Sequence, residues 1–125
     1  MPFQYERDDT RKRITVRVSG SFAIADLFGI VDRHFAEKVG GYAMLYDLTS
    51  LIGAPSVADV ARISDYVQRH VDQRPRGPVA VVTPQPATFG MVRMYALMND
   101  GKVTLGAFHT VEAAERWLDQ RHAEP

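Results

Sequence analysis

The sequence predicts a single α/β domain in which a mainly parallel sheet of about five strands, with an N-terminal edge hairpin, is combined with four helices. Two observations lead to this prediction. Strand-like segments, whose side chains are alternately or continuously apolar, alternate along the chain with segments of helical periodicity. Turn-forming residues separate the segments by short connections, which leave no room for an inserted domain, so residues 1–125 are assigned to one domain.

The N-terminal segment is expected to form the edge hairpin. Residues 3–7 and 13–18 alternate apolar and polar side chains, which is typical of half-exposed strands. Asp8-Asp9-Thr10 between them is a turn sequence. Ser19-Gly20-Ser21 is expected to end the second strand, because glycine and serine weaken strand pairing.

The middle of the chain is predicted to form a helix, a buried strand and a second helix, in that order. Helical spacing of apolar residues covers residues 23–38, and Gly40-Gly41 is expected to end this helix. Residues 42–48 are nearly continuously apolar, as in a strand covered on both faces. Ser56 is expected to cap a second helix that runs to about Gln73. Its inward stripe is predicted to be Val57, Val60, Ala61, Ser64, Val67 and Val71.

The C-terminal half continues the alternation. Residues 79–82 predict a short apolar strand, residues 88–98 a third helix and residues 102–108 the last strand. Thr110 is expected to cap a final helix over residues 111–122. Its core contacts are predicted to be Ala114, Trp117 and Leu118. Regular alternation of strands and helices predicts parallel neighbours joined by helical crossovers.

Composition excludes several classes of function. The 15 basic and 15 acidic residues cancel, so the basic excess expected of a nucleic-acid-binding protein is missing. Cysteine is absent and the 4 histidines are scattered singly, so we expect no metal and no cofactor. No segment has the 18 or more apolar residues of a membrane span, and the polar N-terminal segment is unlike a signal peptide. We therefore expect a cytoplasmic protein with no integral membrane segment.

Polar side chains at the end of the buried strand are the first candidate site. Asp47, Thr49 and Ser50 lie where that strand is expected to end, and Ser56 begins the next helix. Function collects at the carboxyl ends of parallel strands, and a helix N-terminus stabilises an anion. These four residues are therefore candidates for binding or for accepting phosphate. The alternatives are that Ser56 only caps its helix and that Asp47 only bonds nearby backbone amides.

The third helix is the second candidate site, because it is apolar almost all round. One of its faces consists of Met91, Met94, Tyr95 and Met98. This face is a candidate for contact with a partner subunit or an apolar ligand, and the alternative is that it fills the core. Arg93 is the only charge in the middle of the helix. It is a candidate for pairing with Asp47 or for binding an anion, and the alternative is a solvated arginine.

The order of elements, the strand ending Tyr46-Asp47-Leu48-Thr49 and the position of Ser56 resemble the STAS domain of anti-sigma-factor antagonists. The C-terminal half more closely resembles the SpoIIAA-like (STAS/SEC14) family of small bacterial proteins. The matching segments are residues 79–82, 89–95 and 111–118. The resemblance implies a STAS-like fold and a phosphate-accepting serine that docks to an anti-sigma kinase. That serine typically stands in Asp-Ser-Ser-Gly, whereas this chain has Ala54-Pro55-Ser56-Val57.

No catalytic constellation is recognisable, so an enzyme is not expected. The leading hypothesis is a non-enzymatic STAS-like binding or regulatory domain that acts through protein–protein contacts, as a homodimer or with a protein partner. The alternative is a small carrier of apolar ligands or lipids, as the SEC14 side of the resemblance implies, with an apolar pocket of roughly several hundred Å³ between the third helix and the sheet. A third hypothesis is a hydrolase or transferase that uses Asp47, Ser56 and Arg93.

Overall fold

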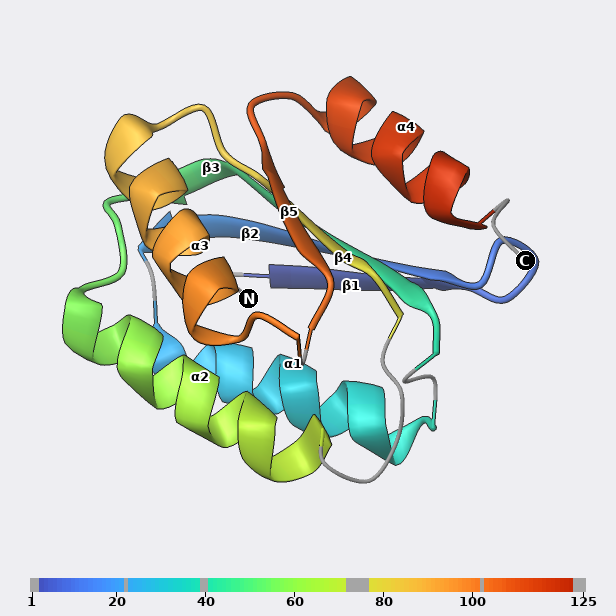
Figure 1. Ribbon diagram of the computed structural model, residues 1–125, viewed down its shortest axis with the longest axis horizontal. Helices are drawn as coiled ribbons and strands as arrows, with labels where there is room; N and C mark the ends of the chain where they lie inside the picture. The colour runs from blue at the N-terminus through green and yellow to red at the C-terminus, as the bar shows by residue number, and fades with distance from the viewer. Residues whose placement is uncertain (1–2, 22, 39–40, 72–76, 102, 123–125) are drawn as a thin grey trace.

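The computed structural model describes residues 3–21, 23–38, 41–71, 77–101 and 103–122. It shows an α/β fold with a five-stranded sheet in the order β1-β2-β3-β4-β5 (Figure 1). The elements are β1 (Phe3–Asp8), β2 (Arg13–Ser21), α1 (Ile24–Ala36), β3 (Ala43–Ile52), α2 (Val57–Val71), β4 (Val79–Val82), α3 (Pro86–Met98), β5 (Leu105–Phe108) and α4 (Val111–His122). Strand β1 is antiparallel to β2, and all other neighbours are parallel. The predicted fold class is confirmed.

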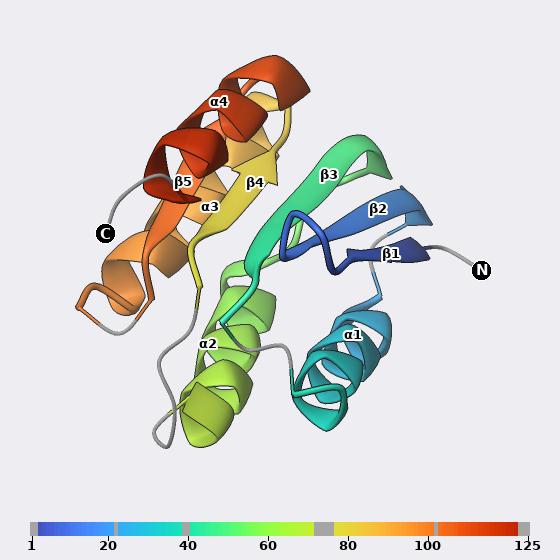
Figure 2. The ribbon, with the colours of Figure 1, turned by 90° about the vertical axis from the view of Figure 1, so that its right-hand side faces the viewer.

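The helices cover the two faces of the sheet unequally. Helices α1, α2 and α3 lie on one face, called here the inner face, and α4 lies on the other (Figures 1 and 2). The strands stand in chain order, and right-handed crossovers between successive parallel strands place their helices on the same face. Helix α4 follows the last strand and packs back over β3, β4 and β5. The centre of β3 is therefore covered on both sides.

Side-chain alternation along the strands divides the hydrophobic core into two parts. On the inner face, Ile14, Met44 and Val79 are buried with Ile30 of α1. On the opposite face, the buried residues are Ala43, Leu45, Ala80 and Val82 of the sheet with Ala114 and Leu118 of α4. Trp117 packs at the border of this second part. The predicted core contacts of α4 and the cap by Thr110, whose Oγ1 accepts a bond from the Ala113 amide at 3.2 Å, are confirmed.

Strands β2 and β3 are longer than predicted. The prediction that Ser19-Gly20-Ser21 ends β2 is wrong, because residues 19–21 pair with residues 50–52 of β3. The pairing shifts by one residue between Arg17 and Ser19, where β3 has one residue more than β2, and Gly20 has a φ of 75°, but neither feature ends the strand. As a result β3 continues to Ile52 and not only to Leu48. The extension comes from pairing between distant segments.

Helix boundaries differ from the prediction by a few residues. Helix α1 ends at Ala36, and Lys38 with a φ of 59° takes the left-handed conformation that was expected of Gly40-Gly41. Helix α3 begins at Pro86, before Thr88, because proline suits the first turn of a helix. Strand β5 begins only at Leu105. The predicted boundary residues Gly40, Gln73 and Lys102 lie outside the described residues.

The helix stripes are only partly as predicted. In α2, Val60, Ser64 and Val67 are buried, but Val57 is 61% exposed and Ala61 is exposed as well. In α1, Ile30 and His34 are buried in addition to Val31 of the predicted stripe, which consists of Ile24, Leu27, Phe28, Val31 and Phe35. Ile30 lies in the core with Ile14 and Met44 of the sheet, and α1 also packs against α2, where Phe28 stacks on Tyr66 with ring centroids 4.3 Å apart. In the described part of the chain, no helix is long and apolar enough to cross a membrane.

Candidate functional site

Asp47 is held by a local interaction on strand β3. Its Oδ1 accepts hydrogen bonds from the backbone amide of Thr49 at 3.0 Å and from the Thr49 hydroxyl at 2.7 Å. This agrees with the simpler of the two sequence interpretations, in which Asp47 bonds a nearby amide. Thr49 and Ser50 were expected in a loop, but both are exposed residues of β3. The strand therefore fixes the backbone from which both hydroxyls project, at the carboxyl end of the central strand.

Ser56 forms a reciprocal cap at the start of α2. Its Oγ accepts a hydrogen bond from the Asp59 amide at 3.0 Å, and Asp59 Oδ2 accepts one from the Ser56 amide at 3.1 Å. This arrangement satisfies two amides at the helix end that have no partner within the helix. Ser56 is exposed, but the Asp59 carboxylate already occupies the place where a helix N-terminus attracts an anion. A phosphate on Ser56 would face that carboxylate and break the cap.

The loop between β3 and α2 is anchored by the start of α3. Gly53 turns the chain with a φ of 81°. The Gln85 side-chain amide donates to the carbonyl of Leu51 at 2.8 Å, and the Thr88 hydroxyl donates to the carbonyl of Gly53 at 3.3 Å. Thr88 is fully buried. Elements far apart in the sequence therefore hold this loop in one conformation.

Two large apolar side chains are exposed beside this loop. Ile52 is 69% exposed and Val57 is 61% exposed. Together with Thr49, Ser50 and Ser56 they form what we call the junction surface, at the carboxyl end of β3. The sequence interpretation missed Ile52 and placed Val57 in the core. A usable signal was present, because Ile52 directly precedes Gly53-Ala54-Pro55, where a strand leaves the sheet.

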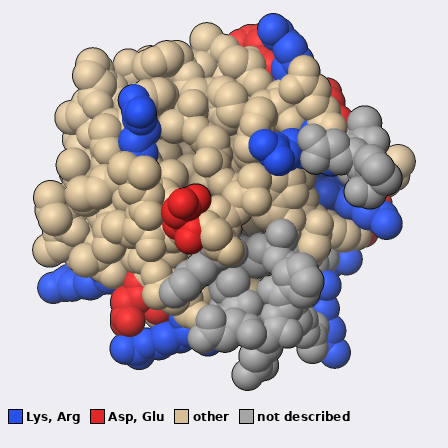
Figure 3. All heavy atoms as spheres, in the orientation of Figure 1, with Lys and Arg blue, Asp and Glu red and all other residues tan. Residues whose placement is uncertain are grey.

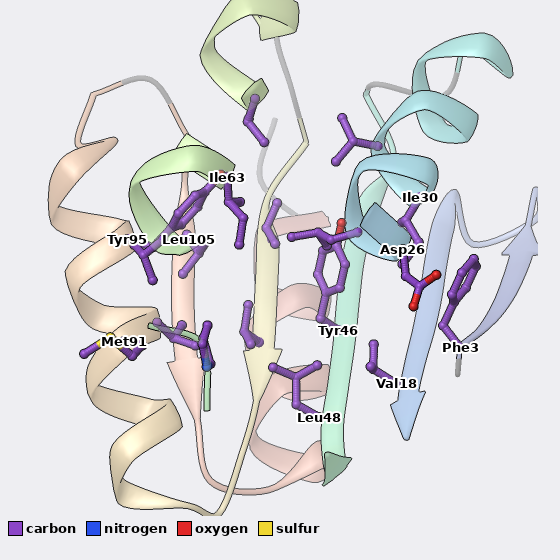
Figure 4. A pocket seen from close by; sticks show the side chains of 18 of the residues that line it. Phe3, Val18, Asp26, Ile30, Tyr46, Leu48, Ile63, Met91, Tyr95 and Leu105 are labelled. Atoms are coloured by element: carbon purple, nitrogen blue, oxygen red, sulfur yellow. The ribbon is translucent and has the colours of Figure 1, made fainter. Parts of the chain in front are cut away.

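An apolar cavity of about 130 Å³ lies between the inner face of the sheet and helices α1, α2 and α3. Figure 4 shows Tyr46 and Leu48 of β3, Ile63 of α2 and Tyr95 of α3 around it. Asp26 of α1 is the one charged residue among the described residues that line it. The volume is smaller than the expected several hundred Å³ of a carrier pocket. It is close to the roughly 150 Å³ of an engineered apolar cavity that binds benzene.

The four apolar candidates on α3 do not form one surface. Met91 and Tyr95 line the cavity, where they are joined by Val92, which is not part of the predicted methionine face. Met94 is half-buried, and Met98 is 45% exposed. The face of α3 that meets the sheet is therefore rotated relative to the predicted methionine face.

The candidates of the enzyme hypothesis are not brought together. Arg93 is exposed and lines a shallow depression beside β5, together with Phe89 of its own helix and Arg121 of α4. Among the described residues no hydrogen bond or ion pair joins Arg93 to Asp47 or Ser56, whose side chains bond Thr49 and Asp59. The predicted pairing of Arg93 with Asp47 is therefore not seen.

A buried polar network that the sequence interpretation missed joins α2 to the end of α3. Asn99 is 1% exposed, and its Nδ2 donates to Ser64 Oγ at 3.1 Å and to the carbonyl of Tyr95 at 2.9 Å. Gln68 Nε2 donates to Asn99 Oδ1 at 3.0 Å. From the sequence, the third helix was predicted to end at residue 98, and Asn99-Asp100-Gly101 was assigned only to its termination. Its asparagine also fixes the distance between the two helices beside the cavity.

Charged groups at the end of α1 bind it to the edge hairpin. Glu37 accepts hydrogen bonds from Arg33 at 2.9 Å and from Arg7 at 3.2 Å, and the Arg33 guanidinium lies 4.0 Å from the Tyr5 ring centroid. The bond from Arg33, followed by that from Arg7, lowers the pKa of Glu37. Burial, followed by the charge of Glu37, raises the pKa of Tyr5 to about 12. This cluster is far from the junction surface in the sheet, at the opposite end of the strands.

This chain is similar to several solved structures, whereas the comparisons with protein families and curated proteins found no match. No model of a protein family matches it, and no curated protein matches it either. An anti-sigma factor antagonist from Mycobacterium paratuberculosis superposes with a TM-score of 0.65 at 16% identity, covering 94% of each chain. An uncharacterized protein of the DUF3478 family from Shewanella loihica, which has a SpoIIAA-like fold, superposes with a TM-score of 0.63 at 16% identity, covering 93% of this chain and 91% of the other. The anti-sigma factor antagonist SpoIIAA in its unphosphorylated form gives 0.55 at 14% identity, covering 94% and 96%.

These similarities define the class of fold. The chain is an α/β domain with the SpoIIAA-like fold that STAS domains have, and the resemblance noted in the sequence is confirmed at this level. The superpositions cover nearly all of this chain and of each solved structure, so the likeness extends to the whole domain.

Proposed function

We propose that this protein is a non-enzymatic regulatory domain that binds a protein partner through the junction surface. The observation that carries the proposal is the exposure of Ile52 and Val57 at 69% and 61% beside an anchored loop. Large apolar side chains on a fixed backbone lose little conformational freedom on binding, so they are suited to be anchors of an interface. Two of the solved structures that resemble this chain are described as anti-sigma factor antagonists, which supports a regulatory role.

In this proposal the polar residues of the junction surface surround the apolar anchors. Thr49, Ser50 and Ser56 are exposed and present hydroxyls next to Ile52 and Val57. The occupied cap at Ser56 favours a contact role for this serine over a phosphate-accepting role, because Asp59 would repel the phosphate. The partner is either another protein or a second copy of this chain.

The test is partner binding by tagged protein that carries Ile52→Lys or Val57→Lys. Met98→Lys is the matched control, because Met98 is 45% exposed on α3 and lines neither the cavity nor the depression beside β5. We expect both junction variants to lose partners, found by quantitative mass spectrometry, that the control retains. Sedimentation velocity of the purified proteins distinguishes a homodimer from a complex with another protein. Only if the partner is a second copy of this chain would the junction variants sediment as monomers while the wild-type protein sediments as a dimer. Equal recovery of all partners by the four proteins would contradict the proposal.

A second candidate function is the binding of a small apolar molecule, and the cavity of about 130 Å³ favours it. Its apolar lining suits a ligand of about the size of one aromatic ring. Val92→Phe is expected to fill the cavity and to abolish binding of benzene or xenon, measured by NMR shifts of the lining methyl groups. Leu97→Phe, at an exposed position of the same helix, is the control. Unchanged methyl shifts in wild-type protein saturated with benzene would exclude this function.

A further inference from the structure

Strand β5 ends the sheet on one side, and in the described part of the chain no strand pairs with its outer edge. The carbonyls of Thr104 and Phe108 accept hydrogen bonds from the β4 side, at 2.8 Å and 2.9 Å. Backbone groups of successive residues in a parallel strand point to opposite sides. Leu105 and Ala107 therefore direct both their N–H and their C=O groups away from β4.

A depression of about 830 Å³ lies beside this edge. Of the β5 residues, Leu105 and Ala107 line it and Gly106 and Phe108 do not, and the preceding Val103 and Thr104 line it as well. Helix α3 contributes Phe89, Arg93 and Leu97 among others, and α4 contributes Arg121. Figure 2 shows β5 at the margin of the sheet with α3 and α4 on its two sides. The depression is thus a trough that runs along an unpaired strand edge.

The side chains around the trough are apolar with a basic bias. Leu97 is 78% exposed, and Phe89 is held flat by stacking on His109 with ring centroids 4.2 Å apart. Arg93 and Arg121 line the trough, against one carboxylate, that of Asp100, among its described lining residues. Figure 3 shows that most of this face of the molecule carries neither acidic nor basic side chains. The charges of Arg93, Arg121 and Asp100 therefore determine the electrostatic attraction of a ligand that binds beside β5.

We propose that the β5 edge binds an extended acidic peptide segment of a partner protein, which adds to the sheet as a further strand. Backbone groups of Leu105 and Ala107 pair with the segment, and Arg93 and Arg121 pair with its carboxylates. A second copy of this chain fits less well, because it would bring its own α3 and α4 into the trough and place like charges together. This site is separate from the junction surface and goes beyond the function proposed for that surface.

The probe is a short, fluorescein-labelled, acetylated peptide of alternating valine and glutamate, and its control has lysine in place of glutamate. Binding is followed by fluorescence anisotropy and by NMR hydrogen exchange at the amides of Leu105 and Ala107. Ala107→Pro removes one outward N–H without removing a bond to β4, so an edge strand tolerates it. Arg93→Glu tests the charge. Arg116→Glu, at an exposed position of α4 that does not line the trough, is the matched control.

We expect the glutamate peptide to bind and to protect both amides from exchange. Ala107→Pro, Arg93→Glu and the lysine peptide should each weaken binding about tenfold or more, whereas Arg116→Glu and Ile52→Lys should leave it unchanged. The last variant separates this site from the junction surface. Absence of binding by the glutamate peptide, or its binding without protection of the two amides, would overturn the proposal. Protection that appears without peptide and rises with protein concentration would overturn it in favour of a second copy.

Discussion

The buried network between α2 and α3 predicts that Asn99 and Ser64 are energetically coupled. Asn99→Ala removes the hydrogen bonds to Ser64, Gln68 and the Tyr95 carbonyl, at 3.1, 3.0 and 2.9 Å. Each bond contributes about 1 kcal/mol net, so the loss is about 3 kcal/mol. Ser64→Ala alone removes the contact with Asn99 and the bond that Gln68 Nε2 donates to Ser64 Oγ at 3.0 Å, so it should cost about 2 kcal/mol. The double variant should cost about 4 kcal/mol, because the contact between the two side chains is then counted once, which gives a coupling energy of about 1 kcal/mol.

The assay is urea unfolding followed by the fluorescence of Trp117, the one tryptophan of the chain, which packs on Phe108 with ring centroids 5.4 Å apart. With an m-value of about 1.5 kcal/mol/M, the Asn99→Ala midpoint should fall by about 2 M. Asp100→Ala is the control, because its exposed side chain should change stability by less than about 0.5 kcal/mol. Additive effects of the two substitutions would refute the coupling. An Asn99→Ala change no larger than that of Asp100→Ala would refute the network itself.

Three further predictions concern local interactions. Ser56→Ala should lower the unfolding free energy by about 1 kcal/mol in thermal unfolding, whereas Ser56→Asn, which retains a neutral cap beside Asp59, should change it little. The lowered pKa of Glu37 means that its stabilising contribution is present above the ordinary pKa of a glutamate and is lost as pH falls through the folded-state pKa. Glu37→Gln should therefore reduce the loss of stability below about pH 5, seen in urea midpoints measured across that range. Gly77→Ala should destabilise strongly or prevent folding, because a Cβ there would overlap the Tyr42 carbonyl oxygen, and circular dichroism would detect the loss of structure.

Each of these three predictions has an outcome that contradicts it. A Ser56→Asn protein as unstable as Ser56→Ala would show that the cap is not the source of the effect. If the urea midpoints of wild-type and Glu37→Gln protein fall in parallel as the pH is lowered, Glu37 does not contribute to the loss of stability in acid. Normal stability of Gly77→Ala would mean that the chain near Tyr42 does not approach residue 77 as closely as described.

The predicted elements that agree best with the structure depend on local interactions. Helix α4 has the predicted bounds, Val111–His122, with its cap at Thr110 and its core contacts at Ala114 and Leu118. The cap at Ser56 was likewise predicted, because a serine next to a helical period forms its bond within one turn. Such features involve residues close in sequence, so periodicity and residue type are sufficient to predict them.

The errors arise where distant segments meet. Ser19-Gly20-Ser21 was predicted to end a strand because its own residues are poor strand formers, but pairing with residues 50–52 keeps it in the sheet. The rotation of α3 has the same kind of cause. Its apolar residues surround the helix, so its periodicity did not identify the side that packs on the sheet, and the contacts of Val92 and Asn99 with other elements decided it.

The sequence by itself determined the order and type of the elements, the parallel sheet with its edge hairpin, and the caps of α2 and α4, because these follow from local periodicity and local hydrogen bonds. The tertiary structure alone decided which side chains are available for function. The exposure of Ile52 and Val57, the cavity beneath α3 and the open edge of β5 each depend on how far neighbouring elements extend over them. Such coverage is a property of packing between distant residues, which the pattern of any one segment does not contain.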